Sequence, residues 1–172
     1  MDAIQNMLTR KSVKKYKADT VPKELLDKII EAGLKAPSGL NKQAPIILAV
    51  TDKKVRDELS ADNMVRDPFH RADPFYGAPA VLVVLADKSA STYLYDGSLV
   101  MENMLLAAHA LGLGACWIHR AKETFELPKW KAFLKELGIE GEYEGIGNCI
   151  VGYADAEPQE KPRRENRVYY VE

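Results

Sequence analysis

The segment from Arg10 to Tyr16, with the sequence RKSVKKY, combines cations and a hydroxyl group at a spacing that suits anion binding. In an extended chain alternate residues share a face, so Arg10, Ser12 and Lys14 would point the same way. A phosphate accepts charge-assisted hydrogen bonds from Arg and Lys and a neutral one from Ser. The pattern therefore predicts a phosphate-binding site, with a solvated basic surface as the alternative.

A second candidate is the stretch from Ala36 to Pro45, APSGLNKQAP, which leads from a predicted helix into a predicted strand. Its small residues would let the backbone approach a flat ligand closely. Asn41 and Gln43 offer paired hydrogen-bond donors and acceptors. A plain turn explains the same local sequence, so this stretch indicates ligand binding only in combination with other signals.

A third candidate is the stretch from Gly112 to His119, GLGACWIH. Cys116 and His119 suggest a nucleophile and its base, but three residues apart on a strand they face opposite sides. His109 lies on an apolar helix, where a hydrogen-bonded structural role is the simpler interpretation. His70 and His109 share no metal-ligand spacing with each other or with a carboxylate, so we expect neither cysteine catalysis nor a metal site.

Nucleotide-binding fingerprints are missing from the sequence. The glycine pairs Gly112/Gly114 and Gly145/Gly147 lack a third glycine at the offset of a dinucleotide-binding loop. The sequence contains no GxxxxGK[ST] motif either. A nucleotide-like cofactor would have to bind through other residues.

The composition is that of one globular domain spanning residues 1–172, and it excludes several classes of function. The 24 basic and 25 acidic residues give a net charge of −1, which argues against nucleic-acid binding or a membrane surface as a partner. Two cysteines are too few for a disulfide framework. The longest apolar stretch, near residues 99–113, is interrupted by polar residues, and we expect a cytoplasmic protein.

The elements that would position these residues follow from periodicity and breaker residues. Helices and strands mix without regular βαβ alternation, which favours an α+β fold. A proline-bounded loop is expected at residues 62–79, and the tail from about 154 to 172 ends in a potential edge strand. Helices are predicted after Asp2 and Pro22 and at residues 53–59, 99–111 and 129–137, and strands at residues 46–50, 80–86, 115–118, 146–153 and 168–171.

The order of these signals along the chain is more specific than any one of them. RKSVKxY is followed by APSGxNxQxP before a strand, then by an APA-hydrophobic strand, GLGxCWI, a GY pair and a PR tail. From Arg10 to Arg164 this combination resembles the nitroreductase family, in its small branch of flavin-dependent oxidoreductases. The resemblance implies a three-layer α/β/α fold with a mostly antiparallel sheet, in an obligate homodimer that binds FMN at its interface.

The resemblance also implies roles for individual residues. Arg10, Ser12 and a tail arginine would hold the FMN phosphate, Lys11 would act largely through its backbone, and Lys14 would lie near the pyrimidine edge of the flavin. The tail would reach the partner subunit, and the partner's copy of the 37–41 loop would cover the ring. The implied cofactor-binding residues are Arg10, Lys11, Ser12, Lys14, Pro37, Ser38, Gly39, Asn41, Gln43, Cys116, Trp117, Ile118, Arg163 and Arg164.

The implied function is transfer of hydride from NAD(P)H through flavin N5 to a small acceptor, such as a nitroaromatic or a quinone, by a ping-pong mechanism. No side chain would need to act as an acid or base, because the flavin carries the chemistry. Two alternatives stay open: a flavin-binding store or redox sensor without turnover, and a flavin-cleaving or dehalogenating enzyme of the same fold. The aromatic-rich 62–76 loop would select the acceptor through Phe69, His70, Phe75 and Tyr76.

Overall fold

The computed structural model describes residues 2–65, 72–160 and 162–172. At its centre is a four-stranded sheet with the order β1-β2-β4-β3, in which every neighbouring pair is antiparallel. The apolar run AVLVVLA forms the fully buried part of β2, which lies inside the sheet as its composition predicts. The strands are β1 (Pro45–Val50), β2 (Ala80–Asp87), β3 (Gly114–Ile118) and β4 (Tyr143–Gly152).

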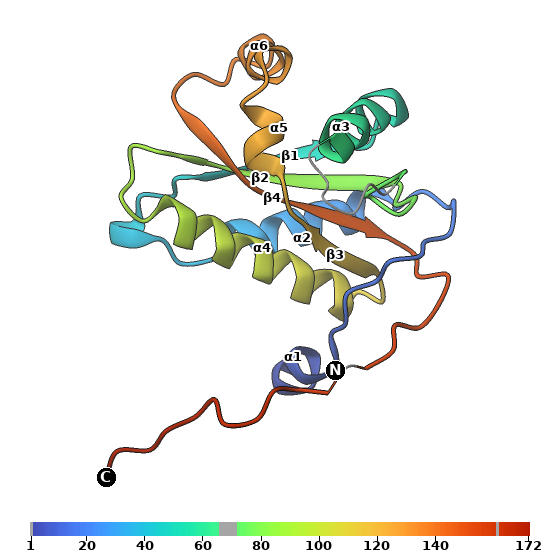
Figure 1. Cartoon of the computed structure of the whole chain (residues 1–172), viewed down its shortest axis with the longest axis vertical. Coiled ribbons are helices and arrows are strands. Elements are labelled where there is room, and N and C mark those ends of the chain that lie inside the picture. The colour runs from blue at the N-terminus through green and yellow to red at the C-terminus, as the bar shows by residue number, and fades with distance from the viewer. Residues whose placement is uncertain (1, 66–71, 161) are drawn as a thin grey trace.

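Helices cover both faces of the sheet and make three layers (Figure 1). Successive residues of β2 alternate between two cores: Leu82 and Val84 face α2 (Lys23–Leu34) and α4 (Tyr93–Ala110). Val81, Val83 and Leu85 face the opposite layer, which consists of α3 (Lys53–Val65), α5 (Ala121–Phe125) and α6 (Pro128–Glu136). The expected α+β fold with an antiparallel sheet between helices is confirmed.

The first helix, α1 (Ala3–Thr9), lies outside these layers and beneath α4 (Figure 1). Asp2 caps it by accepting a hydrogen bond from the Gln5 amide at 2.8 Å, as the sequence predicts. The Asn6 side chain attaches it to α4 by donating to the Leu106 carbonyl at 3.0 Å. The predicted apolar face of α1 nevertheless stays exposed in the single chain.

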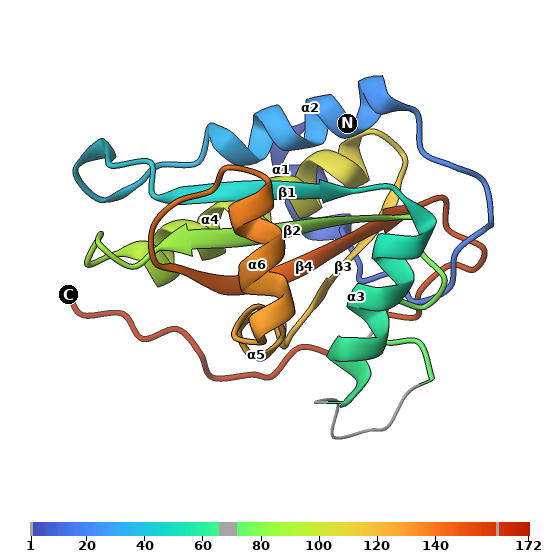
Figure 2. The same cartoon turned by 90° about the horizontal axis from the view of Figure 1, so that it is seen from above.

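Several predicted elements differ from the structure in their extent. The helix expected at residues 53–59 continues to Val65, and the helix expected to start at Leu99 starts at Tyr93. The short helix α5 was not predicted. In the described part of the single chain, residues 168–171 form no strand, and the tail runs away from the body (Figures 1 and 2). Pairing of this segment with the sheet of a partner stays a prediction.

No helix in ranges 2–65, 72–160 and 162–172 is long and apolar enough to cross a membrane. The same residues contain no group of three or more His, Cys, Asp or Glu side chains placed to hold a metal ion.

Candidate functional site

The segment from Arg10 to Tyr16 is extended and runs beside the edge strand β3. Ser12 forms a parallel bridge with Ala115, and the Val13 amide donates to the Ala115 carbonyl at 3.0 Å. The Val13 side chain is buried against Gly114. A Cβ atom added at Gly114 would lie only 2.8 Å from Val13 Cγ2, so a larger residue would not fit there. Because alternate residues of an extended chain point in opposite directions, burial of Val13 leaves Ser12 and Lys14 exposed.

These exposed residues line a surface pocket of about 610 Å³. The start of the C-terminal tail forms its other wall, with Glu157 and Arg163 among the lining residues. A neighbouring pocket of about 880 Å³ continues it along Arg10 and Lys11 to residues 112–115. The predicted cationic cluster thus comes together in one place: Arg10, Lys11, Ser12, Lys14 and Arg163.

Arg164 does not line this pocket; it borders a separate surface hollow together with Asn166, Arg167 and Val168. The structure therefore distinguishes the two tail arginines that the sequence could not separate. Arg163 lies with the cationic cluster, and Arg164 lies beyond it.

Weak ion pairs hold two of the pocket cations. Arg10 Nε lies 4.0 Å from Glu102 Oε1, and Lys11 Nζ lies 3.7 Å from Glu157 Oε1. Partly exposed pairs at such distances contribute little to stability, so a bound phosphate could replace the carboxylates at small cost. The sequence pattern missed Glu102 because its partner is distant in the chain.

His109 is one of the residues that line the larger pocket. Its Nε2 atom lies 2.9 Å from Thr9 Oγ1, so the predicted hydrogen-bonded structural role is confirmed. Burial and the nearby Arg10 guanidinium lower the pKa of His109. A neutral imidazole is therefore favoured next to the cationic cluster.

The stretch 37–43 forms a tight loop around the 3-10 helix η1 (Gly39–Asn41). Its backbone is strained, with positive φ angles at Leu40, Asn41 and Gln43. The Gly39 amide donates to the buried Asp96 carboxylate at 3.0 Å, which fixes the loop to the first turn of α4. Ser38 accepts from the Gln43 amide at 3.0 Å, while Pro37, Asn41 and Gln43 remain exposed.

The loop and the cationic cluster lie toward opposite ends of α4. Asp96, which holds the loop, lies in the first turn of this 18-residue helix, and His109 lies in its last turn. At about 1.5 Å per residue the two are roughly 20 Å apart. The residues that line the pocket of Arg10 and Ser12 include none of the loop residues Pro37, Ser38, Gly39, Asn41 and Gln43 of the same chain.

The three β3 residues named from the sequence turn their side chains mostly into the protein. Cys116 and Ile118 are buried in the core beneath α3, α5 and α6, and Trp117 packs toward α4. Their backbone, at the sheet edge next to the Arg10–Tyr16 segment, is the part that could face a ligand. Cys149 on β4 is also buried, and burial raises the pKa of its thiol.

The expected acceptor-binding loop divides into buried and exposed parts. Phe69 and His70 lie outside the described residues. Phe75 is fully buried, and the Arg56 guanidinium lies 5.5 Å from its ring centre. The ring therefore packs in the core and does not contact an acceptor as the sequence predicted. Tyr76 is half-buried, and the Lys14 ammonium lies 5.9 Å from its ring centre.

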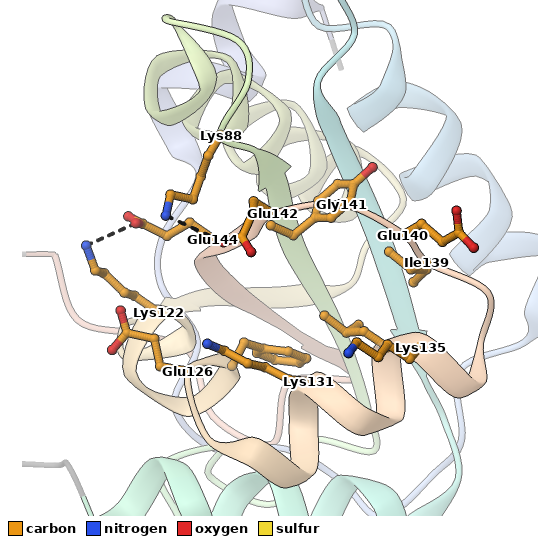
Figure 3. A pocket seen from close by; sticks show the side chains of 13 residues that line it. Lys88, Lys122, Glu126, Lys131, Lys135, Ile139, Glu140, Gly141, Glu142 and Glu144 are labelled. Atoms are coloured by element: carbon orange, nitrogen blue, oxygen red, sulfur yellow. Dashed lines mark ion pairs between the residues drawn. The ribbon is translucent and has the colours of Figure 1, made fainter.

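A further hollow of about 540 Å³ lies between α6 and the start of β4 (Figure 3). Lys122 pairs with Glu144 at 3.0 Å across it, and Lys88 with Glu142 at 3.9 Å. Its rim carries four lysines and four glutamates, so the charges balance: Lys88, Lys122, Lys131, Lys135, Glu126, Glu140, Glu142 and Glu144. This hollow lacks the excess positive charge of the cluster around Arg10.

Residues 7–65 and 60–153 match the model of the family described as "Nitroreductase family". The chain belongs to the nitroreductase family. This membership confirms the resemblance inferred from the order of the motifs and agrees with the antiparallel sheet between helices.

Individual relatives agree with this family. A Methanothermobacter thermautotrophicus protein is 32% identical over 125 residues, which cover 68% of this chain and 60% of that relative. A Vibrio harveyi protein named "NADPH-flavin oxidoreductase" is 29% identical, over 94% of this chain and 70% of its own length. A solved Bacteroides fragilis nitroreductase with bound FMN covers 100% of both chains with a TM-score of 0.90 and 26% identity.

Proposed function

We propose that this chain is an FMN-dependent oxidoreductase that passes hydride from NAD(P)H to a small organic acceptor. The observation that carries the proposal is the pocket beside β3, where Arg10, Ser12, Lys14 and Arg163 meet. The bound FMN of the Bacteroides fragilis structure and the name of the Vibrio harveyi relative support it.

The residues at this pocket fit a flavin mononucleotide. A guanidinium and a hydroxyl suit the phosphate, and the pocket volume of about 610 Å³ is in the range of ligand sites. Arg10, Ser12 and Arg163 would hold the phosphate, and Lys11 would add its backbone. Lys14 would lie at the pyrimidine edge of the ring, where a cation favours the reduced, more negative state.

The site requires a second copy of the chain. The loop with Pro37, Ser38, Gly39, Asn41 and Gln43 does not line the cationic pocket of its own chain, so we propose that it covers the pocket of a partner. Apolar side chains left exposed on α1 and α4 offer a surface for this contact: Ile4, Met7, Leu8, Leu94, Tyr95 and Leu99.

Bound FMN would supply the redox chemistry, accepting hydride at N5 from NAD(P)H and giving it to an acceptor that enters afterwards. The protein residues position the cofactor, stabilise charge and exclude water. Cys116 and Ile118 are buried and offer the ring their backbone. Nitroaromatic compounds and quinones are the proposed acceptors, because both are flat and Tyr76 is an aromatic side chain near the pocket.

The test is direct. Purified protein loaded with FMN is mixed with NADH or NADPH without oxygen, and flavin absorbance is followed. Bleaching, followed by recovery of absorbance on addition of a nitroaromatic or a quinone, is the expected result. FMN binding without bleaching by either nucleotide would instead indicate a flavin store or sensor, and absence of FMN binding would exclude both functions.

A further inference from the structure

The turn from Asp73 to Gly77 is fixed by one carboxylate. Asp73 accepts hydrogen bonds from two side chains of α3, the Arg56 guanidinium at 2.7 Å and the Ser60 hydroxyl at 2.6 Å. It also accepts from the backbone amides of Phe75 at 2.9 Å and Gly77 at 2.7 Å. Four hydrogen bonds to one side chain leave this turn little conformational freedom.

The turn holds Tyr76 in an unfavourable backbone conformation. Its φ angle is 53°, in the left-handed region that bulky residues rarely adopt. Asn or Gly would occupy this position with less strain. Such strain persists where surrounding contacts enforce it, and it often occurs at functional sites. The contacts of the Tyr76 ring are therefore a place to look for a function.

The ring of Tyr76 lies beside the Lys14 ammonium, 5.9 Å from ring centre to Nζ. Lys14 differs from its neighbours: Lys11 pairs with Glu157 and Lys15 pairs with Asp155. Among the residues that the structure describes, no carboxylate forms an ion pair with Lys14. An aromatic face attracts a cation without cancelling its charge, whereas a carboxylate would neutralise it.

We infer that Tyr76 is a positioning residue: Asp73 fixes the turn that carries it, and its ring holds the Lys14 ammonium toward the flavin with the charge unneutralised. The inference rests on the proposed function and extends it to residues outside the cationic pocket. It assigns a role to the strained turn and to the two α3 residues, Arg56 and Ser60, that fix it. Loss of the ring should lower the reduction potential of bound FMN.

The experiment compares Tyr76→Asn with Tyr76→Phe. Asn removes the ring and relieves the strain at positive φ, so the variant should fold, whereas Phe keeps the ring. The midpoint potential of bound FMN is measured by equilibration with a reference dye. Cation–π contacts at exposed sites are worth about a two- to fivefold change in an equilibrium. For two electrons this predicts a fall of about 10–20 mV in Tyr76→Asn and none in Tyr76→Phe.

Two further backgrounds identify the cation involved. In Lys14→Gln protein, Tyr76→Asn should cause no additional fall, because the partner of the ring is already gone. In Lys15→Gln protein, which changes the adjacent lysine, the full fall should remain. An unchanged potential in Tyr76→Asn, or an equal fall with and without Lys14, would overturn the inference while leaving the proposed function intact. If the parent protein does not bind FMN, the proposed function itself fails.

Discussion

Asp73 Oδ2 lies 2.7 Å from Arg56 Nη2 and joins the turn before β2 to the first turn of α3. Arg56 is a buried cation, with an exposed fraction of 8%, and it also donates from Nε to the Ala78 carbonyl at 3.1 Å. Two segments that are distant in sequence are thereby fixed at the sheet end that carries Tyr76. The pair has consequences for both stability and pH dependence.

The Asp73–Arg56 pair should make folding sensitive to acid. Burial acts to raise the pKa of Asp73, but hydrogen bonds from Arg56, Ser60 and the amides of Gly77 and Phe75 hold it below its ordinary value of 3.8. The stabilisation is therefore complete above that value and is lost as the pH falls through the lower, folded-state pKa. Asp73→Asn should lower the free energy of unfolding by about 1–3 kcal/mol at pH 7.

Urea unfolding of the parent and of Asp73→Asn at pH 7 and at pH values below 4 measures this effect. The difference between the two proteins should shrink toward the lowest pH. Asp19→Asn, at an exposed position, is the control. A difference that stays constant with pH would show that protonation of Asp73 does not matter for folding.

Phe75→Ala should destabilise the fold without changing the choice of acceptor. The ring is fully buried, and truncation of a buried Phe costs about 3–5 kcal/mol. Phe125→Ala, in the same core, is a matched control with a similar expected loss. Urea unfolding gives the stability, and the ratio of rates with a quinone and a nitroaromatic gives the selectivity. A selective change of that ratio in folded Phe75→Ala protein would return Phe75 to the acceptor site.

Arg10→Ala should weaken the binding of FMN and leave the binding of riboflavin unchanged. A hydrogen bond to a charged group contributes about 1.5–3 kcal/mol, so affinity for FMN should fall by about one to two decades. Riboflavin lacks the phosphate and should bind both proteins alike in a fluorescence titration. Lys15→Ala changes an adjacent cation that pairs with Asp155 at 2.8 Å and should leave both affinities near the parent values. An equal loss of affinity for riboflavin and for FMN would contradict the proposal that Arg10 binds the phosphate.

Leu8→Asp should weaken the proposed dimer. Leu8 is 75% exposed in the single chain, and burial of a leucine stabilises an interface by about 1.5–3 kcal/mol. Light scattering over a dilution series should show dissociation at a concentration at least about tenfold higher than for the parent. FMN content should fall with the dimer, because the site needs loops from two copies.

The matched control for the dimer is Leu137→Asp. Leu137 is 51% exposed but follows α6, in the layer on the other side of the sheet. This variant should keep the parent's assembly state and FMN content. A parent protein that is monomeric at all concentrations would refute the two-copy site.

Several elements could be predicted from strong local signals in the sequence. Continuous apolar runs give β2 and the core of β4, Asp2 caps α1, and the alternation of Arg10, Ser12 and Lys14 places them on one exposed face. These features depend on neighbouring residues, because the periodic spacing of apolar and polar residues determines which side chains are buried and which are exposed. The family could also be inferred from the sequence, because its motifs follow one another along the chain in the order that the nitroreductase family shows.

Which of these residues come into contact could be read from the folded structure alone. It places Arg163 with the cationic pocket and the 37–43 loop at the far end of α4, and it buries Phe75 while Tyr76 reaches Lys14. The Arg56–Asp73 and Arg10–Glu102 pairs join residues that no local pattern connects. Such contacts depend on packing between distant segments, and the sequence period carries no information about which faces will come together.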